Sequence, residues 1–181
     1  EAVKVARQYL SYFQGPIPDW DCVDQRKLRH LIPENRLRVY DVREVIDAVA
    51  DIDSVLELRA GYGHGVVTSF VRIEGRPMGL IANNPMHLGG AIDSDAADKA
   101  SRFMQLCDAF DIPILSLCDT PGNMVGPDHE GTALVRHCCR MFVVGANITV
   151  PVITVVLRKG YGLGAPGMAG GGFHAPLATL S

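Results

Sequence analysis

Two segments of this chain repeat one layout, and that layout restricts the possible fold more than any other feature. Ile112-Pro113-Ile114-Leu115 and Val150-Pro151-Val152-Ile153 each follow a helical pattern, open an apolar strand and lead into a loop rich in glycine and proline. Apolar runs such as 112–118 and 149–157 are typical of strands that are buried on both faces. The two segments lie about 40 residues apart, within the range of repeated supersecondary units. The pattern predicts an α/β spiral of repeated strand–strand–helix (ββα) units.

The other expected elements fit this layout. Strands over 66–72 and 78–82 flank a turn at Glu74-Gly75. Asp41, and later Asp93 or Ser94, offer N-caps for helices. The helices are expected over residues 1–13, about 42–51, 94–110 and, after a loop over 119–128, a stretch that ends near 146.

The sequence patterns at the two ends of the chain predict secondary structure less clearly. The first helix has one apolar stripe, made of Val5, Tyr9, Leu10 and Phe13. Residues 14–35 begin with a glycine and two prolines, and we expect an irregular linker there. Residues 175–181 are an apolar segment without a closing element, as in a fold that is cut short.

Charge and cysteine content exclude several classes of protein. With 17 Lys and Arg against 20 Asp and Glu, the net charge is −3, and no basic run predicts a nucleic-acid surface. No apolar run approaches the roughly 20 residues of a membrane helix. Five cysteines without CxxC spacing predict neither a disulfide framework nor a zinc site. We therefore expect no metal, no nucleic acid and no membrane, a cytoplasmic or mitochondrial-matrix location, and small molecules or other protein chains as partners.

A glycine-dense segment over 158–172 is the first candidate site. It follows a buried strand and is expected to open a helix, so its backbone N–H groups face whatever binds there. Two such N–H groups can hold a developing oxyanion, commonly the largest electrostatic contribution in acyl chemistry. Close packing of a helix on the sheet is the alternative interpretation.

Two other uses of this segment are not expected. Gly162, Gly164 and Gly167 match the dinucleotide pattern G-x-G-x-x-G, but no Asp or Glu follows Met168 to hold a ribose. A phosphate-binding P-loop would need Gly-Lys followed by Ser or Thr, which the segment lacks.

A second candidate loop covers residues 119–131. It also leaves a buried strand through a Pro/Gly turn, and its N–H groups can cap an anionic or carbonyl oxygen. A tight turn in which Asp128 or Glu130 stabilises the next helix is an equal alternative. Side-chain catalysts are sparse, because no Ser lies in a G-x-S-x-G elbow and no His/carboxylate cluster has metal spacing. His129 and His137 are interpreted as polar surface of a helix, and His64 and His87 as possible loop ligands.

Several motifs resemble the second half of the biotin-dependent acyl-CoA carboxyltransferases, in particular the beta subunits of the propionyl-CoA and acetyl-CoA carboxylase type. The resemblance runs from about Arg38 to Phe173, in order and with natural spacing. The matching stretches include Asn84-Pro85, Gly90-Ala91-Ile92-Asp93, Lys99-Ala100, Cys107-Asp108-Ala109-Phe110, Asp119-Thr120-Pro121-Gly122, Arg136-His137-Cys138 and Arg158-Lys159-Gly160-Tyr161-Gly162.

The resemblance implies a crotonase-like (ClpP/crotonase) fold and a carboxyl transfer from carboxybiotin to the α-carbon of an acyl-CoA. Residues 1–37 then look like the end of a preceding half and a linker, and 38–181 like an incomplete C-terminal carboxyltransferase domain. The family's active site lies between halves of different subunits, usually in a hexamer. Its partners are biotin carboxylase and a biotin carrier. This fragment alone is therefore expected to be inactive.

The resemblance also implies roles for individual residues. The N–H groups of Leu163 and Gly164 would bind the ureido oxygen of biotin, whose freed nitrogen then takes the proton from the acyl α-carbon. The implied biotin-binding residues are Tyr161, Gly162 and Ala165. The implied substrate-binding residues are Gly122, Asn123, Gly126 and Pro166.

Four positions depart from the family pattern: Asn123, Gly160, Pro166 and Gly167, which lies beside Pro166 at the acyl pocket. Asn123 stands where an apolar residue, often Phe, is usual, and Gly160 stands where Ala is common. Pro166 occupies a position beside the acyl pocket where relatives carry Asp, Gln or other residues, so the sequence leaves the acyl group open. It also leaves open two alternatives: a biotin-dependent decarboxylase that runs the half-reaction toward biotin, and a non-catalytic assembly module.

Overall fold

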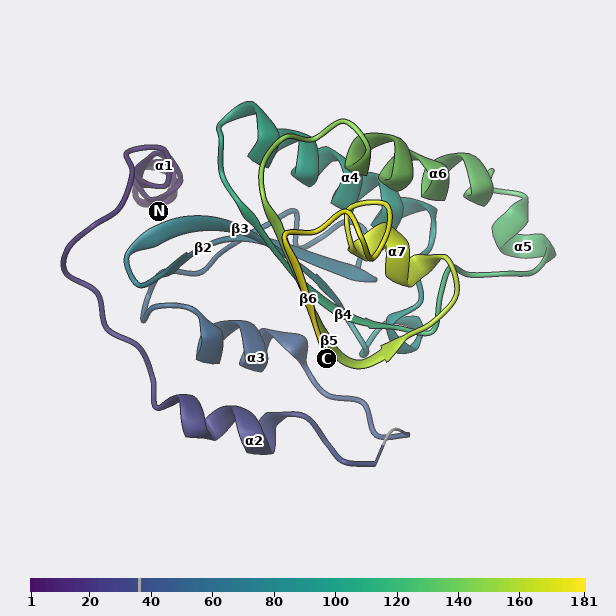
Figure 1. Cartoon of the computed structure of the whole chain (residues 1–181), viewed down its shortest axis with the longest axis horizontal. Helices are drawn as coiled ribbons and strands as arrows, with labels where there is room; N and C mark the ends of the chain where they lie inside the picture. Colours follow the sequence, from purple (N-terminus) through teal and green to yellow (C-terminus); the bar gives the residue numbers. More distant parts are fainter. Residues whose placement is uncertain (36) are drawn as a thin grey trace.

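One mixed sheet runs through the molecule, with helices on both of its faces (Figure 1). The computed structural model describes residues 1–35 and 37–181. In this part, six strands lie in the order β1-β2-β3-β4-β5-β6. They are β1 (Leu56–Leu58), β2 (Val66–Ile73), β3 (Arg76–Asn83), β4 (Ile114–Thr120), β5 (Val152–Gly160) and β6 (Ala178–Leu180). The pairs β1/β2 and β2/β3 are antiparallel, whereas β3 to β6 are parallel.

The helices cover the sheet in two layers. The longer α4 and α6 lie on one face, and α2 and α3 on the other (Figure 1). The elements are α1 (Ala2–Ser11), η1 (Gln25–Lys27), α2 (Leu28–Leu31), α3 (Val42–Val49), η2 (Leu88–Gly90), α4 (Ser94–Ala109), α5 (Pro127–Glu130), α6 (Leu134–Gly145) and α7 (Gly164–Met168). The expected N-caps are confirmed, since Asp41 accepts from the Arg43 N–H and Asp93 from the Ala96 N–H.

Strand β4 contributes to a hydrophobic core on each face of the sheet. Ile114 and Cys118 pack in the core beneath α4 and α6, whereas Leu115 and Leu117 pack in the core beside α3. Successive side chains of a strand point to opposite faces, so a strand covered on both sides must be apolar throughout. The prediction of a strand buried on both faces is confirmed.

The bounds of the two central parallel strands, β4 and β5, differ from the prediction. β4 begins at Ile114 instead of 112, and β5 at Val152 instead of 149. Pro113 and Pro151 have no N–H, and each contributes only its carbonyl, to Gly79 and Ile114 respectively, before the ladder begins. β5 also continues to Gly160, which pairs with Thr120 across a register shift. Residues 158–160 therefore belong to a strand, not to the glycine-dense loop.

Three further expectations are corrected. The helix expected up to 146 is two helices, α5 and α6, because Ala133 adopts a left-handed conformation (φ 59°) between them. The expected linker contains η1 and α2, whose Leu28 and Leu31 pack toward the core beside α3. The apolar end at 178–180 pairs with β5 as strand β6, and β1 was not predicted at all.

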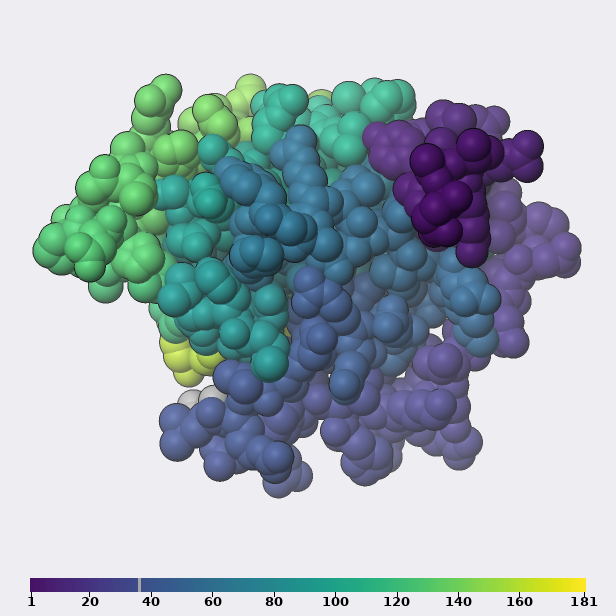
Figure 2. All heavy atoms as spheres, turned by 180° about the vertical axis from the view of Figure 1, so that it is seen from behind, coloured from purple at the N-terminus to yellow at the C-terminus, as the bar shows by residue number. Residues whose placement is uncertain are grey.

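The first helix exposes much of the stripe that was expected to be buried. Val5 and Leu10 are exposed, whereas Tyr12, just after the helix, is buried and stacks on Phe70 with ring centroids 5.4 Å apart. The buried Arg72 donates to the Ser11 carbonyl (2.7 Å), which ties the end of α1 to β2. Figure 2 shows α1 in dark purple, standing out on the surface. Phe110, expected on the inner face of α4, is also exposed.

Lys99 is buried in α4 with only 1% of its surface exposed. It lines a small cavity of about 40 Å³ together with Arg59 and Arg102. Within residues 1–35 and 37–181, no side chain or carbonyl forms a hydrogen bond or ion pair with its ammonium. Burial lowers the pKa of Lys99, and the opposing attraction of Glu57 is smaller. Because burial penalises the charged form, this lysine is expected to destabilise the fold.

We therefore expect Lys99→Met to raise the free energy of unfolding by about 0.5–2 kcal/mol at pH 7, the usual gain from one stabilising substitution, because methionine places no charge in this buried position. A lysine whose pKa is lowered by folding destabilises the folded state most at neutral and acidic pH. The gain should shrink as pH rises toward about 10.4, the pKa of an unfolded lysine. Thermal unfolding of the full-length protein at pH 7 and 9.5 measures this.

The exposed Lys27→Met is the control, with an expected change within about 0.5 kcal/mol. A lower melting temperature for Lys99→Met would contradict the prediction. It would mean that an acidic group outside these 181 residues pairs with Lys99.

Candidate active site

The loops that follow β3, β4 and β5 meet at one edge of the sheet, because these three strands run parallel. Ala82 pairs with Leu117, and Cys118 pairs with Val156, so the strands end close to one another. In open α/β sheets, ligands bind at this carboxyl edge. The two candidate loops of the sequence, after β4 and after β5, therefore lie on the same side of the molecule.

These two glycine-rich loops are in direct contact. The Tyr161 N–H donates to the Thr120 carbonyl (3.1 Å), which joins the loops where they leave the strands. Gly164 lies so near Gly122 that a Cβ on Gly164 would be 2.9 Å from the Gly122 Cα. Gly122 and Gly162 have positive φ angles of 125° and 56°, which glycine adopts without strain. What the sequence presented as two candidates is one site in the structure.

A third segment, between β3 and α4, joins the same cluster. Ile92 forms a parallel bridge with Asn123. The Ile92 N–H donates to the Gly122 carbonyl (3.0 Å), and the Met124 N–H donates to the Ile92 carbonyl (2.8 Å). These bonds hold the loop after β4 extended. The Asn123 nitrogen lies 3.3 Å from the place that a Gly164 Cβ would take, so this amide is beside the start of α7.

Three backbone N–H groups at the start of α7 have no acceptor among the residues that the structure describes: those of Leu163, Gly164 and Ala165. The first bond of the helix runs from the Gly167 N–H to the Leu163 carbonyl (3.1 Å). The free N–H groups at the start of a helical turn carry the positive end of the peptide dipoles. Leu163 is 67% exposed, so solvent reaches this end of the loop. The arrangement is suited to binding an anionic or carbonyl oxygen.

The structure separates the remaining predicted site residues. Tyr161 and Gly162 are exposed just before the free donors, and Pro166 is half-buried in the first turn of α7. Gly126 lies apart from them in the chain's course, as the N-cap of α5 with φ 105° (Figure 1). Gly122 and Asn123 thus join Leu163 and Gly164, whereas Gly126 opens the next helix.

The later glycines of the segment support the alternative interpretation, close packing. Gly145 of α6 lies directly against the backbone of Gly170 and Gly171, where no Cβ would fit. Gly167 lies against Met141 of the same helix. Both interpretations therefore apply, but to different glycines. Gly162 and Gly164 lie beside the free N–H donors, whereas Gly170 and Gly171 allow close packing against α6.

A buried ionic cluster adjoins both loops. Asp119 has no exposed surface, and its Oδ2 accepts from the Arg158 Nε (2.9 Å) and from the Tyr40 hydroxyl (2.8 Å). The Arg158 guanidinium also lies over the Tyr40 ring, 4.6 Å from its centre. Burial, reinforced by the Asp119 charge, raises the pKa of Tyr40, so its hydroxyl stays protonated and donates. Sequence reasoning missed this cluster, although a charged residue directly after an apolar strand was a usable signal.

Side chains offer little else for chemistry. His137 Nδ1 lies 3.0 Å from Asp98, which also pairs with Arg140, so this histidine belongs to an ion-pair cluster between α4 and α6. Burial raises the pKa of the Cys118 and Cys138 thiols to about 11, so both stay protonated at neutral pH. Among residues 1–35 and 37–181, no group of three or more His, Cys, Asp or Glu is arranged for a metal ion.

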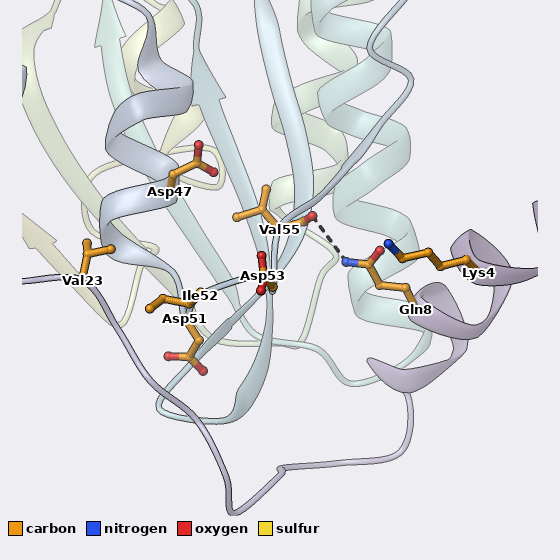
Figure 3. Close-up of a pocket in the computed structure, with 8 residues that line it drawn as sticks. All are labelled: Lys4, Gln8, Val23, Asp47, Asp51, Ile52, Asp53 and Val55. Carbon is orange, nitrogen blue, oxygen red and sulfur yellow. Dashed lines mark hydrogen bonds between the residues drawn. The ribbon is translucent and has the colours of Figure 1, made fainter. Parts of the chain in front are cut away.

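A large cavity lies elsewhere. It has a volume of about 870 Å³ and separates α1 from the segment 47–55 (Figure 3). Gln8 bridges it to the Val55 carbonyl (3.4 Å), and the Asp51 carboxylate near it is already bonded to the N–H groups of Glu74 and Gly75. These residues adjoin the β2–β3 turn, at the opposite edge of the sheet from the glycine loops. Free backbone donors, rather than cavity size, therefore identify the site.

Residues 1–178 match the family described as the carboxyl transferase domain. This chain belongs to the carboxyl transferase domain family. The resemblance seen in the sequence is confirmed. The part of this family domain that the structure describes contains no helix long and apolar enough to cross a membrane.

Solved structures of the family share the architecture. A single-chain, multi-domain long-chain acyl-CoA carboxylase matches with a TM-score of 0.96 and 57% identity, over 99% of this chain and 19% of the other. The transcarboxylase 12S hexamer with bound methylmalonyl-CoA matches with a TM-score of 0.78 and 40% identity, over 84% and 30% of the two chains. The chain therefore has the mixed α/β, crotonase-like fold of these carboxyl transferases, as predicted.

A curated relative of the family is similar in sequence. The biotin-dependent acetyl-/propionyl-coenzyme A carboxylase beta5 subunit of Mycobacterium tuberculosis is 42% identical over 148 residues. That alignment covers 82% of this chain but only 27% of the subunit. For two other curated relatives the share of their length is 36% and 28%. The carboxyl transferase domain described here is thus about a third of such a protein.

Proposed function

We propose that this chain forms the carboxybiotin-binding half of a carboxyltransferase site, which delivers a carboxyl group to the α-carbon of an acyl-CoA. The observation that carries the proposal is the pair of free N–H groups at Leu163 and Gly164, beside the Gly122–Asn123 backbone that Gly164 contacts directly. Family membership supports it, because curated relatives are named as biotin-dependent acyl-CoA carboxylases.

We assign the biotin ring to this edge of the sheet. Carboxybiotin, when bound, would supply an activated carboxyl group, and its ureido oxygen would need hydrogen-bond donors. We assign the Leu163 and Gly164 N–H groups as the donors for this oxygen. Donors that are held in place before the reaction stabilise a developing negative charge strongly. We assign Tyr161 and Gly162 to the walls of the biotin site. Ala165 can contribute only its free backbone N–H, because its side chain is buried in the core. No side-chain base is required of this half, in agreement with the paired state of His137.

The acyl group is proposed to be long. Identity is 57% to the long-chain acyl-CoA carboxylase over nearly the whole chain, against 40% to the transcarboxylase that binds methylmalonyl-CoA. We assign Gly122, Asn123 and Pro166 to the acyl side of the site. Gly126, which the resemblance also implied, lies apart as the N-cap of α5 and is not included.

The whole protein is proposed to work in a larger assembly. Biotin carboxylase and biotin carrier units are its expected partners, either as separate subunits or on the same polypeptide, since one relative is a single-chain, multi-domain carboxylase. A homo-oligomer is expected because the transcarboxylase 12S relative is a hexamer. A reducing compartment, the cytoplasm or a mitochondrial matrix, fits the five free cysteines.

A carboxylation assay of the full-length protein tests this function. Labelled carboxyl transfer from a carboxylated biotin carrier is measured with acetyl-, propionyl-, octanoyl- and palmitoyl-CoA. We expect transfer, with the highest kcat/KM for the longer chains, and none from the 181-residue chain alone. Absence of transfer to every acyl-CoA would overturn the proposal, and a preference for propionyl-CoA would overturn only the assignment of a long chain.

Pro166 is expected to influence acyl selectivity. It lies two residues beyond Gly164 and is half-buried, so it contributes a wall without an N–H donor. One methylene group more or less in an apolar pocket changes the discrimination between two substrates by about 1–3 kcal/mol, or 10- to 200-fold. Pro166→Asp should therefore lower kcat/KM for palmitoyl-CoA relative to propionyl-CoA by at least about tenfold.

Pro166→Ala is the matched control, because it restores the N–H without adding a charge. We expect its selectivity to stay near that of the wild type. Equal loss of kcat/KM on both acyl-CoAs in the aspartate variant, together with a lower melting temperature, would show that position 166 acts through folding.

A further inference from the structure

Asp119 is a buried carboxylate that joins three strand ends. It is the penultimate residue of β4, and its exposed surface is zero. Its Oδ2 accepts from the Arg158 Nε at 2.9 Å and from the Tyr40 hydroxyl at 2.8 Å. The Arg158 side chain is itself only 6% exposed. Burying an ion pair is costly, and stability alone rarely explains why such a pair is present.

Further bonds extend this cluster to the neighbouring strands. The Asp119 N–H donates to the Asn83 side-chain oxygen at the end of β3 (3.0 Å). The Lys159 N–H of β5 donates to the Asp119 Oδ1 (3.3 Å), and the Lys159 Nζ donates to the Gly89 carbonyl (2.7 Å). The ends of β3, β4 and β5 and the turn at 88–90 are thus held together through polar contacts.

The cluster lies directly upstream of both halves of the proposed donor site. Asp119 precedes Gly122 by three residues, and Arg158 precedes Leu163 by five. Between these points, the loops share the backbone bond from Tyr161 to Thr120 and the contact of Gly164 with Gly122. The separation of the α7 donors from the Gly122 surface therefore depends on how β4 and β5 are joined at Asp119.

We propose that Asp119, Arg158 and Tyr40 are positioning residues, which hold the Leu163 and Gly164 N–H groups at the correct distance from the Gly122–Asn123 surface. The inference rests on the proposed function, because only a transfer site needs that distance to be held. A displacement of about 1 Å in a site of this kind can lower the rate about 100-fold. A purely structural cluster, in contrast, is replaceable by apolar side chains of similar volume without loss of function.

That contrast defines the decisive variant, the triple replacement Tyr40→Phe, Asp119→Leu and Arg158→Met in the full-length protein. It removes the charges of the Asp119–Arg158 pair and the hydroxyl together. The Lys159 ammonium, 3.7 Å from Asp119 Oδ1, loses that partner but keeps 17% exposure and its bond to the Gly89 carbonyl, so the fold should survive. We expect kcat for carboxyl transfer to fall about 100-fold, with the KM for acyl-CoA unchanged. Hydrogen exchange should become faster at residues 161–168 and stay unchanged in α4.

The control is the Arg43–Glu57 pair between α3 and β1, which is joined by two bonds of 2.8 Å, is more exposed than the Asp119 cluster and lies away from the glycine loops. Its apolar double replacement, Arg43→Met with Glu57→Leu, should leave kcat near the wild-type value. If the triple variant fails to fold, Tyr40→Phe alone decides the matter: it removes a single hydroxyl, and kcat should still fall at least threefold at an unchanged melting temperature.

Each outcome has one meaning. A stable triple variant, or a stable Tyr40→Phe variant if the triple does not fold, with wild-type kcat and unchanged exchange at 161–168 would overturn the positioning role. If the wild-type protein transfers no carboxyl group at all, the proposed function fails, and the exchange measurement still reports whether the cluster holds the loop. Faster exchange in that case would leave Asp119, Arg158 and Tyr40 as positioning residues of a site with another substrate.

Discussion

Leu163→Pro in the full-length protein should lower kcat for carboxyl transfer by about 10²- to 10³-fold, or about 3–4 kcal/mol. The substitution deletes one of the two N–H groups that we assign to the ureido oxygen. The backbone at Leu163 has φ −75° and ψ −17°, close to the φ of about −65° that proline imposes. Its side chain is largely exposed, and its N–H is not used by the fold within the described residues. The change therefore removes a donor with little cost in stability.

Two variants separate the loss of this N–H donor from the loss of a side chain. Leu163→Ala removes the side chain but keeps the N–H, and it should retain most of the rate. His137→Ala removes a contact with Asp98 between α4 and α6 and should also retain most of the rate. If His137→Ala proved as damaging as Leu163→Pro at unchanged melting temperature, a side-chain base would have to be sought in place of backbone donors.

Gly164→Val should abolish transfer by a different route. A Cβ at position 164 would lie 2.9 Å from both the Cα and the carbonyl carbon of Gly122, closer than such atoms approach without movement of the backbone. Valine keeps the N–H, so any loss comes from the loops being forced apart. Overpacking of this kind costs about 1–3 kcal/mol in stability, and a displaced donor costs about 100-fold or more in kcat.

The control for Gly164→Val lies in the same segment. A Cβ at Gly172 would meet no atom within 4 Å, so Gly172→Ala should change neither the rate nor the melting temperature. Both glycine variants are assayed for transfer and for thermal unfolding. Wild-type kcat in a folded Gly164→Val protein would show that the contact between the two loops is not needed for transfer.

Elements that depend on neighbouring residues were predicted well from the sequence. Helix α4 begins at Ser94 after the Asp93 cap and ends at Ala109, one residue before the expected end. The β2–β3 hairpin turns at Glu74-Gly75, as expected, because glycine at φ 74° is a local requirement of the turn. A cap, a turn residue and an apolar period are all contained within a few positions of the chain, so they are visible before folding.

Elements that depend on distant partners were missed. Strand β1 has three residues and exists only through its pairing with β2. Tyr40 bonds to Asp119 across 79 positions, and no local pattern marks that pair. The apolar stripe of the first helix was only half right. Tyr9 and Phe13 contact Phe70 of β2, but Val5 and Leu10 are exposed. The most buried contact with Phe70 is made by Tyr12, after the helix ends.

By itself, the sequence determined the family, the α/β fold class and the two glycine-rich loops, because motif spacing, apolar runs and turn residues are properties of short stretches. Only the tertiary structure decided that Gly122 and Gly164 touch, that Asp119 joins the two loops through Arg158, and that Gly170 and Gly171 serve packing. These contacts arise from the parallel register of β4 and β5, which brings residues about forty positions apart to one edge of the sheet. Strand register is set by the pairing of whole strands and by the burial of both faces, and the residues of a single loop carry no information about it.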